Sequence, residues 1–226
     1  MIKATNYLRT EAKFVDRSLD SVAEHFTQFG NTFFCCEVGV GRCIVDIAGF
    51  VMHRSKFPLI ERPFTITESI ILAHLRNHGA TRIDLLEQRC GLESGGLRKG
   101  NLDRLKDRHI IRYGAGGQIS LENYSFPISI IAIEAKLMRW RDALRQATEY
   151  KKFADQSFVL LPSEYAGGAI SSKNEFKNAG VGLFVFDNQS GLDCIVKAAR
   201  IGDHGWRRDF VLSSLLTHAH EYDRDA

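Results

Sequence analysis

The spacing of apolar residues along this chain alternates between the period of a helix and that of a strand. This alternation predicts a mixed α/β fold. In "RSLDSVAEHFTQFGN" the apolar residues recur at helical spacing, and Gly30-Asn31 ends the expected helix. Two β-prone runs follow, "TFFCCEV" and "RCIVDIAGFVM", which Gly39-Val40-Gly41 joins into an antiparallel hairpin. Later the pattern predicts a strand at "ISIIAIEA", a helix over Arg139 to Phe153, a strand at "SFVLLP", a helix ending at Gly180 and a strand at "VGLFVFD".

A separate unit is expected over residues 63–122. It begins with a helix whose Thr65-x-x-Glu68 is a capping box, and Gly79 ends that helix. A short helix over Ile83 to Cys90, a third helix reaching about Lys106 and a glycine-tipped hairpin follow. This order resembles a winged helix-turn-helix.

Residues 1–62 and 123–226 are expected to form the two parts of one core domain around the 63–122 unit. A last amphipathic segment, "WRRDFVLSSLLTHAHEY", is expected to pack on this core or on a sister subunit.

Composition narrows the class of protein. The 226 residues are 44% hydrophobic and carry a net charge of only +3, so any basic surface must come from local clustering. Charged residues interrupt the N-terminal segment and no apolar run reaches bilayer length, which predicts a cytoplasmic protein without membrane contact. The five cysteines lack zinc-site spacing and are expected to be reduced thiols, with a structural zinc site as the alternative.

The candidate catalytic residues are ionisable residues that lie within two apolar strands. Glu-x-Lys occurs at four places, but only Glu134-Ala135-Lys136 ends an apolar, β-branched run. Residues two apart in a strand project to the same face, so Glu134 and Lys136 are expected to point the same way. Ionisable side chains are costly to bury without a partner of opposite charge. Asp46 is likewise a lone carboxylate within "CIVDIAGFV".

A third carboxylate is expected beside these two. Glu37 shares the face of Asp46 in the expected hairpin register, and Glu24 is a rival that lies off the apolar face of its helix. Glu37, Asp46 and Glu134 are therefore the predicted ligands of Mg²⁺ or Mn²⁺, which prefer carboxylate and water oxygens. Phosphodiester hydrolysis suits this set, with Lys136 serving the attacking water or the charge that grows on the phosphate.

Asp46, then Glu134-x-Lys136, then Gln146-x-x-x-Tyr150 resemble, in this order, the motifs of the PD-(D/E)XK nuclease superfamily. The last element is similar to the Q-x-x-x-Y of its exonuclease-like branch. The resemblance covers residues Ser18 to Leu161 and implies a restriction-endonuclease-like mixed sheet flanked by helices. This chain departs from the superfamily pattern between Asp46 and Glu134. The superfamily has a short connection there, whereas this chain has the winged-helix-like unit.

Basic residues concentrate on the third helix and wing of the inserted unit, which favours DNA as a partner. The residues expected to bind DNA are Arg98, Lys99, Arg104, Lys106 and Arg139. Two alternatives to DNA binding are open. The winged helix can serve dimerisation or packing, and the basic side chains can be ordinary hydrated residues of a helix surface. Trp140 shares a helical face with Leu144 and Ala147 and is expected in the core.

These features together predict a metal-dependent deoxyribonuclease, with roles in repair, restriction or defence against foreign DNA by family analogy. Asp46, Glu134, Lys136, Gln146 and Tyr150 are its predicted catalytic residues. The alternative is a DNA-binding regulator or assembly subunit whose nuclease-like fold does not cut. RNA as the substrate and a homodimeric state both stay open.

Overall fold

The chain folds into two compact units. The structure, a computed structural model, describes residues 2–40, 43–52, 60, 62–90, 100–122, 124, 128–202 and 205–225, with side chains from residue 11 to residue 222. Unit 1 comprises Met1–Phe57 and Pro127–His204, and unit 2 comprises Pro58–Phe126 and Gly205–Ala226. Unit 2 thus interrupts the sequence of unit 1 close to the boundaries expected for the inserted unit.

Unit 1 is built on a six-stranded mixed sheet with the order β1-β2-β6-β7-β8-β9. The β1–β2 and β2–β6 pairs are antiparallel, the β6–β7 and β7–β8 pairs are parallel, and the β8–β9 pair is antiparallel. The expected β1–β2 hairpin is confirmed. The strands are β1 (Asn31–Val40), β2 (Cys43–Met52), β6 (Ile128–Ala135), β7 (Gln156–Pro162), β8 (Gly182–Asp187) and β9 (Gly191–Val196).

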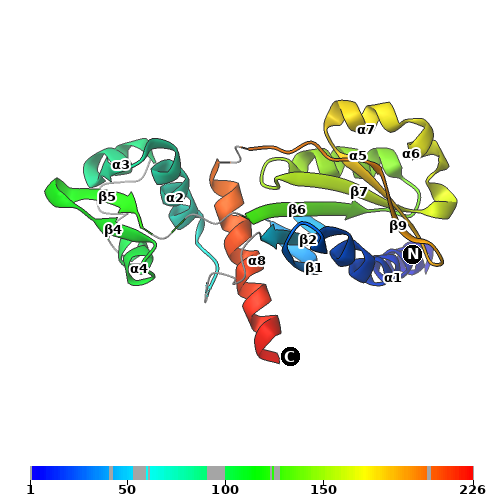
Figure 1. Ribbon diagram of the computed structural model, residues 1–226, viewed down its shortest axis with the longest axis horizontal. Helices are drawn as coiled ribbons and strands as arrows, with labels where there is room; N and C mark the ends of the chain where they lie inside the picture. Colours follow the sequence, from blue (N-terminus) through cyan, green and yellow to red (C-terminus); the bar gives the residue numbers. More distant parts are fainter. Residues whose placement is uncertain are drawn as a thin grey trace. The chain divides into compact units, whose positions relative to one another are not determined.

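Helices cover both faces of this sheet (Figure 1). On one face, Val22 and Phe26 of the first helix join a buried cluster with Ile47. On the other face, Trp140 and Phe176 bury against strand residues of β7 and β8, so Trp140 is in the core as expected. The helices are α1 (Ile2–Thr27), α5 (Trp140–Tyr150), α6 (Gly167–Ser171) and α7 (Lys173–Ala179), with the 3₁₀ turn η2 (Ser163–Tyr165).

Two elements of unit 1 differ from the sequence prediction. Helix α1 begins at Ile2, well before the amphipathic segment from which it was predicted. Its apolar face continues backwards through buried Val15 and Phe14, a stretch in which charged residues obscure the period. Strand β9 was not predicted. It lies at the sheet edge, where most of its residues are not fully buried, and its apolar and polar residues alternate only weakly.

Unit 2 combines helices with a small antiparallel sheet of order β3-β5-β4. The capping box at Thr65 and Glu68 and the helix end at Gly79 are both confirmed. In chain order the elements are α2 (Ile66–His78), β3 (Thr81–Arg82), α3 (Ile83–Arg89), α4 (Asn101–Asp107), β4 (Ile111–Tyr113), the 3₁₀ turn η1 (Ala115–Gly117), β5 (Gln118–Leu121) and α8 (Gly205–Asp225).

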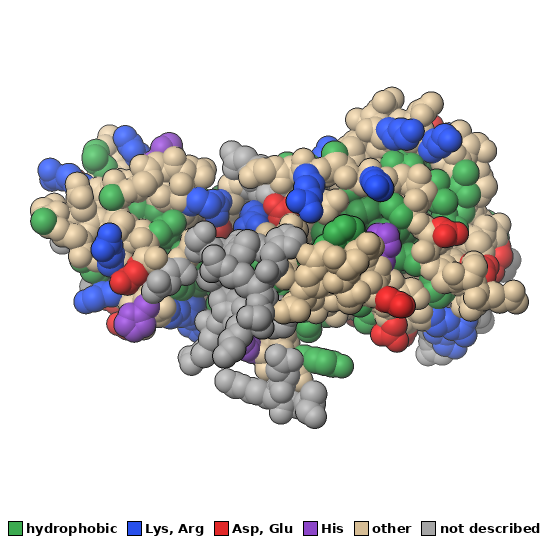
Figure 2. Space-filling model, viewed as in Figure 1, with side chains coloured by type: hydrophobic (Ala, Val, Ile, Leu, Met, Phe, Trp, Pro, Cys, Tyr) green, Lys and Arg blue, Asp and Glu red, His purple; other side chains and the backbone are tan. Residues whose placement is uncertain are grey.

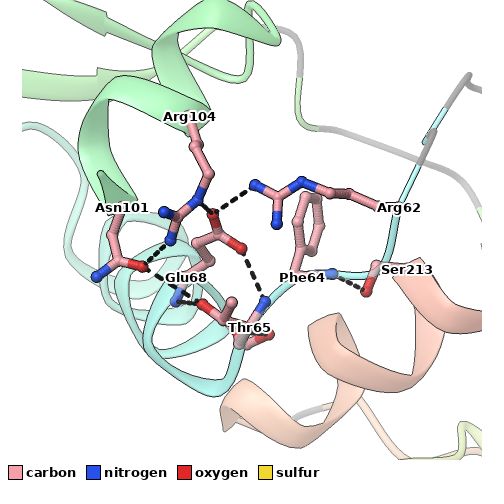
Figure 3. Close-up of polar contacts among 8 residues, drawn as sticks. Arg62, Phe64, Thr65, Glu68, Asn101, Arg104 and Ser213 are labelled. Carbon is pink, nitrogen blue, oxygen red and sulfur yellow. Dashed lines mark hydrogen bonds and ion pairs between the residues drawn. The ribbon is translucent and has the colours of Figure 1, made fainter.

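Glu68 joins the start of α2 to α4 within unit 2 (Figure 3). Its carboxylate is fully buried, accepts the Thr65 backbone N–H at 2.7 Å and accepts Nε of Arg104 at 2.8 Å. Burial would raise the pKa of Glu68, but the hydrogen bonds from Thr65 and Arg104 and the charges of Arg104 and Arg62 lower it below its ordinary value. The capping box therefore also positions α4.

Helix α8 belongs to unit 2, which corrects the assignment of residues 205–226 to the core domain. Asp209 of α8 is fully buried and accepts hydrogen bonds from Arg76 of α2 and from the Tyr124 hydroxyl. Ser213 Oγ accepts the Phe64 backbone N–H at 2.8 Å. Amphipathicity predicted that this helix packs on a surface, whereas the choice of surface depends on these specific polar pairs. No described helix, α8 included, has the length and apolar character that crossing a bilayer requires.

We expect Asp209→Ala to lower the free energy of unfolding of unit 2 by about 1–3 kcal/mol, because it removes the acceptor of the buried Tyr124 hydroxyl and the ion-pair partner of Arg76. Urea denaturation of the full chain measures this change. The control is Asp84→Ala, which removes an exposed partner of Arg82 and should leave the midpoint unchanged. Equal effects of the two substitutions would contradict the structural role of Asp209.

Candidate active site

The register of the sheet places Asp46 and Glu134 opposite one another at one end of β2 and β6. The last backbone pair recorded between these antiparallel strands is Ile47 with Ile133, and the next position on each strand is Asp46 and Glu134. The carboxylate of Asp46 takes over from the backbone there, because its Oδ2 accepts the Ala135 N–H at 2.8 Å. The strand end is thus closed by a carboxylate.

Glu134 is the most buried acid of this group, with only 1% of its side chain exposed. Lys136 Nζ lies 2.8 Å from its Oε1, and the Tyr150 hydroxyl donates a hydrogen bond to its Oε2. The Tyr150 oxygen also lies 3.3 Å from the carbonyl oxygen of Ile44. Because Tyr150 is the last residue of α5, the end of this helix is joined to the ends of β6 and β2.

Lys136 is shared by three carboxylates. Besides Glu134, its Nζ lies 3.7 Å from Asp46 Oδ2 and 3.3 Å from Glu11 Oε1. Glu11 comes from α1 and was not recognised as a site residue from the sequence. A signal was present, since Glu11 continues the helical face of Val15 and Val22 towards the N-terminus.

The electrostatics of the two opposed acids are unfavourable for full ionisation. Burial raises the pKa of Glu134, and the nearby charge of Asp46 raises it further, against the hydrogen bonds from Lys136 and Tyr150. Burial also raises the pKa of Asp46, and the charge of Lys136 and the Ala135 N–H offset this only in part. Both acids therefore bind protons more readily than ordinary carboxyl groups.

The two donors are held in their protonated forms. Burial alone would lower the pKa of Lys136, but the hydrogen bond to Glu134 and the charges of Asp46, Glu134 and Glu11 outweigh burial and raise it. Burial and the charge of Glu134 raise the pKa of Tyr150 well above its ordinary value. At neutral pH the site therefore contains an ammonium group and a neutral phenol.

Glu37 lies beside this cluster without joining its ion pairs. The flanking β1–β2 pairs, Cys36 with Ile47 and Val38 with Val45, bring Glu37 opposite Asp46. Its backbone is in the left-handed region, with φ 57°, and its side chain is exposed. Glu37, Asp46 and Glu11 line a cavity of about 570 Å³ beside α1. The rival acid Glu24 is exposed further along α1.

The last predicted catalytic residue, Gln146, is half-buried on α5, one turn before Tyr150.

The residues predicted to bind DNA have different surroundings. Arg139 is exposed and forms an ion pair with Asp142. Lys106 of α4 is exposed, and its Nζ lies 5.5 Å from the Tyr113 ring centroid. Arg104 is held by Glu68 inside unit 2. Arg98 and Lys99 lie outside the described residues.

A metal centre is not preformed in the described part of the chain. No group of three or more His, Cys, Asp or Glu side chains is arranged there to hold a metal ion. Comparison with protein-family models, curated proteins and solved structures finds no match to this chain. The geometry of Asp46, Glu134, Lys136 and Tyr150 is therefore the basis on which a function can be inferred.

We expect Lys136→Met to lower the free energy of unfolding by about 3–5 kcal/mol at pH 8, because it leaves buried carboxylates without their cation. The pKa values of Asp46 and Glu134 already lie above those of the unfolded chain and rise further without the ammonium. Stability is then greatest below the unfolded pKa and is lost as pH rises through the folded pKa.

Denaturation at pH 8 and pH 5 in the presence of a chelator measures this dependence. The loss at pH 5 should be smaller by about 1 kcal/mol or more, because protonation relieves the uncompensated charge. Lys13→Met, on the exposed face of α1, is the control and should show no comparable dependence. A loss independent of pH would refute the electrostatic description of the cluster.

Proposed function

We propose that the chain is a divalent-cation-dependent nuclease that hydrolyses DNA phosphodiester bonds at the cluster of Asp46, Glu134 and Lys136. The observation that carries the proposal is the convergence of these three side chains at one strand end. Asp46 and Glu134 are far apart in sequence, and the sheet register places them directly opposite one another. This is the pair of acids that the PD-(D/E)XK resemblance requires.

The chemistry of the donor set suits Mg²⁺ or Mn²⁺, although the described side chains are not already arranged around an ion. Glu11, Asp46 and Glu134 supply carboxylate oxygens, and a single ammonium faces all three. Fully ionised, the cluster carries an excess of negative charge that a hard divalent cation would compensate. Asp46 and Glu134 would hold the ion, with Glu37 as a further oxygen donor across the hairpin. When bound, such an ion would polarise the phosphate and acidify a water molecule.

The protein's own groups have separate tasks in this reaction. The water oxygen loses a proton and forms a bond to phosphorus, and one P–O ester bond breaks as its oxygen leaves and takes up a proton. The Lys136 ammonium would donate to the attacking water or to the phosphate oxygens, where negative charge grows. The Tyr150 hydroxyl keeps Glu134 in its orientation through their hydrogen bond. Gln146, one turn earlier on α5, would extend this polar face towards the substrate.

The order of elements supports the same proposal. Unit 1 presents a helix, three antiparallel neighbours β1, β2 and β6, then α5 and the parallel strand β7. This is the order expected of a restriction-endonuclease-like core. In unit 2, the helices α2, α3 and α4 followed by the β4–β5 hairpin have the order of a winged helix-turn-helix.

DNA is the proposed substrate because unit 2 presents basic side chains around α4 and its hairpin. Lys106 and Arg112 are exposed, as are the acids Asp103 and Asp107 of α4. The visible face of unit 2 carries several Lys and Arg side chains (Figure 2). Arg104 contributes less to such a surface, because its guanidinium is engaged by Glu68 and Asn101. Arg139, exposed at the start of α5, is the corresponding candidate on unit 1.

A second candidate function is a DNA-binding protein that does not cut. The observation that favours it is the position of Lys136 Nζ, which already forms ion pairs with the acids that would hold the ion. A cation must therefore compete with an internal ammonium. In this case the cluster would only stabilise the end of the sheet.

We expect the wild-type chain to cleave DNA with Mg²⁺ or Mn²⁺, and Asp46→Asn, Glu134→Gln and Lys136→Met each to reduce the rate by about a hundredfold or more. Supercoiled plasmid, linear duplex, single-stranded DNA and RNA are the substrates to compare. Glu149→Gln, on the exposed surface of α5, is the control and should cut as wild type does. Calorimetry should show Mn²⁺ binding that Asp46→Asn abolishes.

Absence of cleavage on every substrate, together with absence of Mn²⁺ binding, would remove the nuclease and leave the non-cutting protein. Cleavage that persists in all three site variants would move the activity to another site or to a contaminant. Circular dichroism of each variant separates a lost catalytic group from a lost fold.

We also expect Lys106→Gln/Arg112→Gln to weaken binding to duplex DNA uniformly across sequences. Removal of two phosphate-contacting cations should reduce the slope of log affinity against log salt by about 1–2. Fluorescence anisotropy over a salt series measures this slope. Lys173→Gln/Lys177→Gln removes the same charge from exposed positions of α7 and should leave the slope unchanged if binding uses unit 2.

A further inference from the structure

A second cavity lies in unit 1 at the other ends of the strands that carry the candidate active site. It has a volume of about 370 Å³ and lies where the end of α1 meets Val51 of β2, Ser129 of β6 and Gln156 of β7. Ser129 and Glu134 are five positions apart on β6, which separates the cavity from the acids by about 16 Å along the strand. None of the residues that line this cavity belongs to the acid cluster.

The wall of the cavity is largely aromatic. Phe26, Phe29, Phe158 and His25 line it, and Phe158 stacks on Phe184 with ring centroids 4.3 Å apart. Phe29 is 47% exposed, which is unusual for a phenylalanine that adjoins an aromatic cluster. Burial lowers the pKa of His25, so at neutral pH its imidazole adds aromatic surface and not charge. A flat apolar group would cover this wall.

The charged part of the lining has one sign. Lys197 and Arg200 line the cavity, and its described lining contains no carboxylate. Neither cation has an ion-pair partner among the described residues. Hydrophobic side chains flanked by Lys and Arg side chains are visible on this face of unit 1 (Figure 2). The polar lining groups Gln28, Ser129 and Gln156 can add hydrogen bonds.

We propose that this cavity binds a small aromatic anion, with its ring against Phe26, Phe29 and Phe158 and its anionic group facing Lys197 and Arg200. An apolar pocket with a few convergent polar groups is the usual form of a small-molecule site, and its volume suits a ligand of one or two rings. Charge complementarity selects a carboxylate, sulfonate or phosphate ester over a neutral ring. The proposal is independent of the nuclease activity, since it shares no residue with the acid cluster.

Two probes that differ only in charge test the proposal. Calorimetric titration of the full chain with 1-naphthylacetate should show saturable binding at one site, about three- to tenfold tighter than with the isosteric neutral 1-naphthylacetamide. Lys197→Gln/Arg200→Gln should bring the two affinities together by weakening only the acetate. Ala198→Trp, which places a large side chain in the lining, should abolish binding of both probes.

Lys173→Gln/Lys177→Gln removes the same two positive charges from the exposed surface of α7 and should keep the wild-type preference. Absence of saturable binding, or equal affinities of the wild type for the two probes, would overturn the proposal. Equal losses in the two double variants would also overturn it, because they would indicate a response to net charge alone. Since Lys197 and Arg200 are exposed, their replacement tests the cavity even if Ala198→Trp fails to fold.

Discussion

The burial of one carboxylate, that of Glu134, is the constraint on which the organisation of unit 1 depends. With almost no exposure to water, this group must receive hydrogen bonds from the protein, and Lys136 and Tyr150 provide them. Tyr150 ends α5, so satisfying Glu134 also fixes how this helix meets the sheet. Lys136 in turn draws in Asp46 from β2 and Glu11 from α1. A single buried charge thus connects both faces of the sheet.

This arrangement is costly for stability and useful for chemistry. Two acids with raised pKa values face each other, and one ammonium does not balance three carboxylates. A protein selected for stability alone could place apolar residues at this strand end, where their burial would cost less. Such clusters occur at sites that bind a cation or move a proton, which is the reason that we propose a catalytic role for this one.

Sequence alone predicted the contacts of the acid cluster that depend on local rules. The parity of a strand predicted that Glu134 and Lys136 point to the same side, and the hairpin register predicted that Glu37 lies on the face of Asp46. The helical period places Glu11 on the face of Val15 and Val22, but no local pattern determines where α1 crosses the sheet and so whether Glu11 reaches Lys136. The same limit explains α8, whose apolar face was recognised but whose partner, α2, is selected by the ion pair between Arg76 and the buried Asp209. Arg104 was predicted to bind DNA because it is a basic residue on the third helix, whereas its ion pair with the buried Glu68 is apparent only from the fold.

The location of both proposed sites follows from the composition of β6. Its central residues, from Ile130 to Ile133, are fully buried, and Ile131 and Ile133 pack in one cluster with α1. A strand enclosed in this way cannot carry polar side chains along its length without unpaired buried groups. Polar chemistry is therefore restricted to its two ends, where Ser129 lines the aromatic cavity and Glu134 joins the acid cluster. Because the segment between them is tightly packed on both faces, β6 holds both ends on a rigid element, which is the support that precise positioning of a ligand requires.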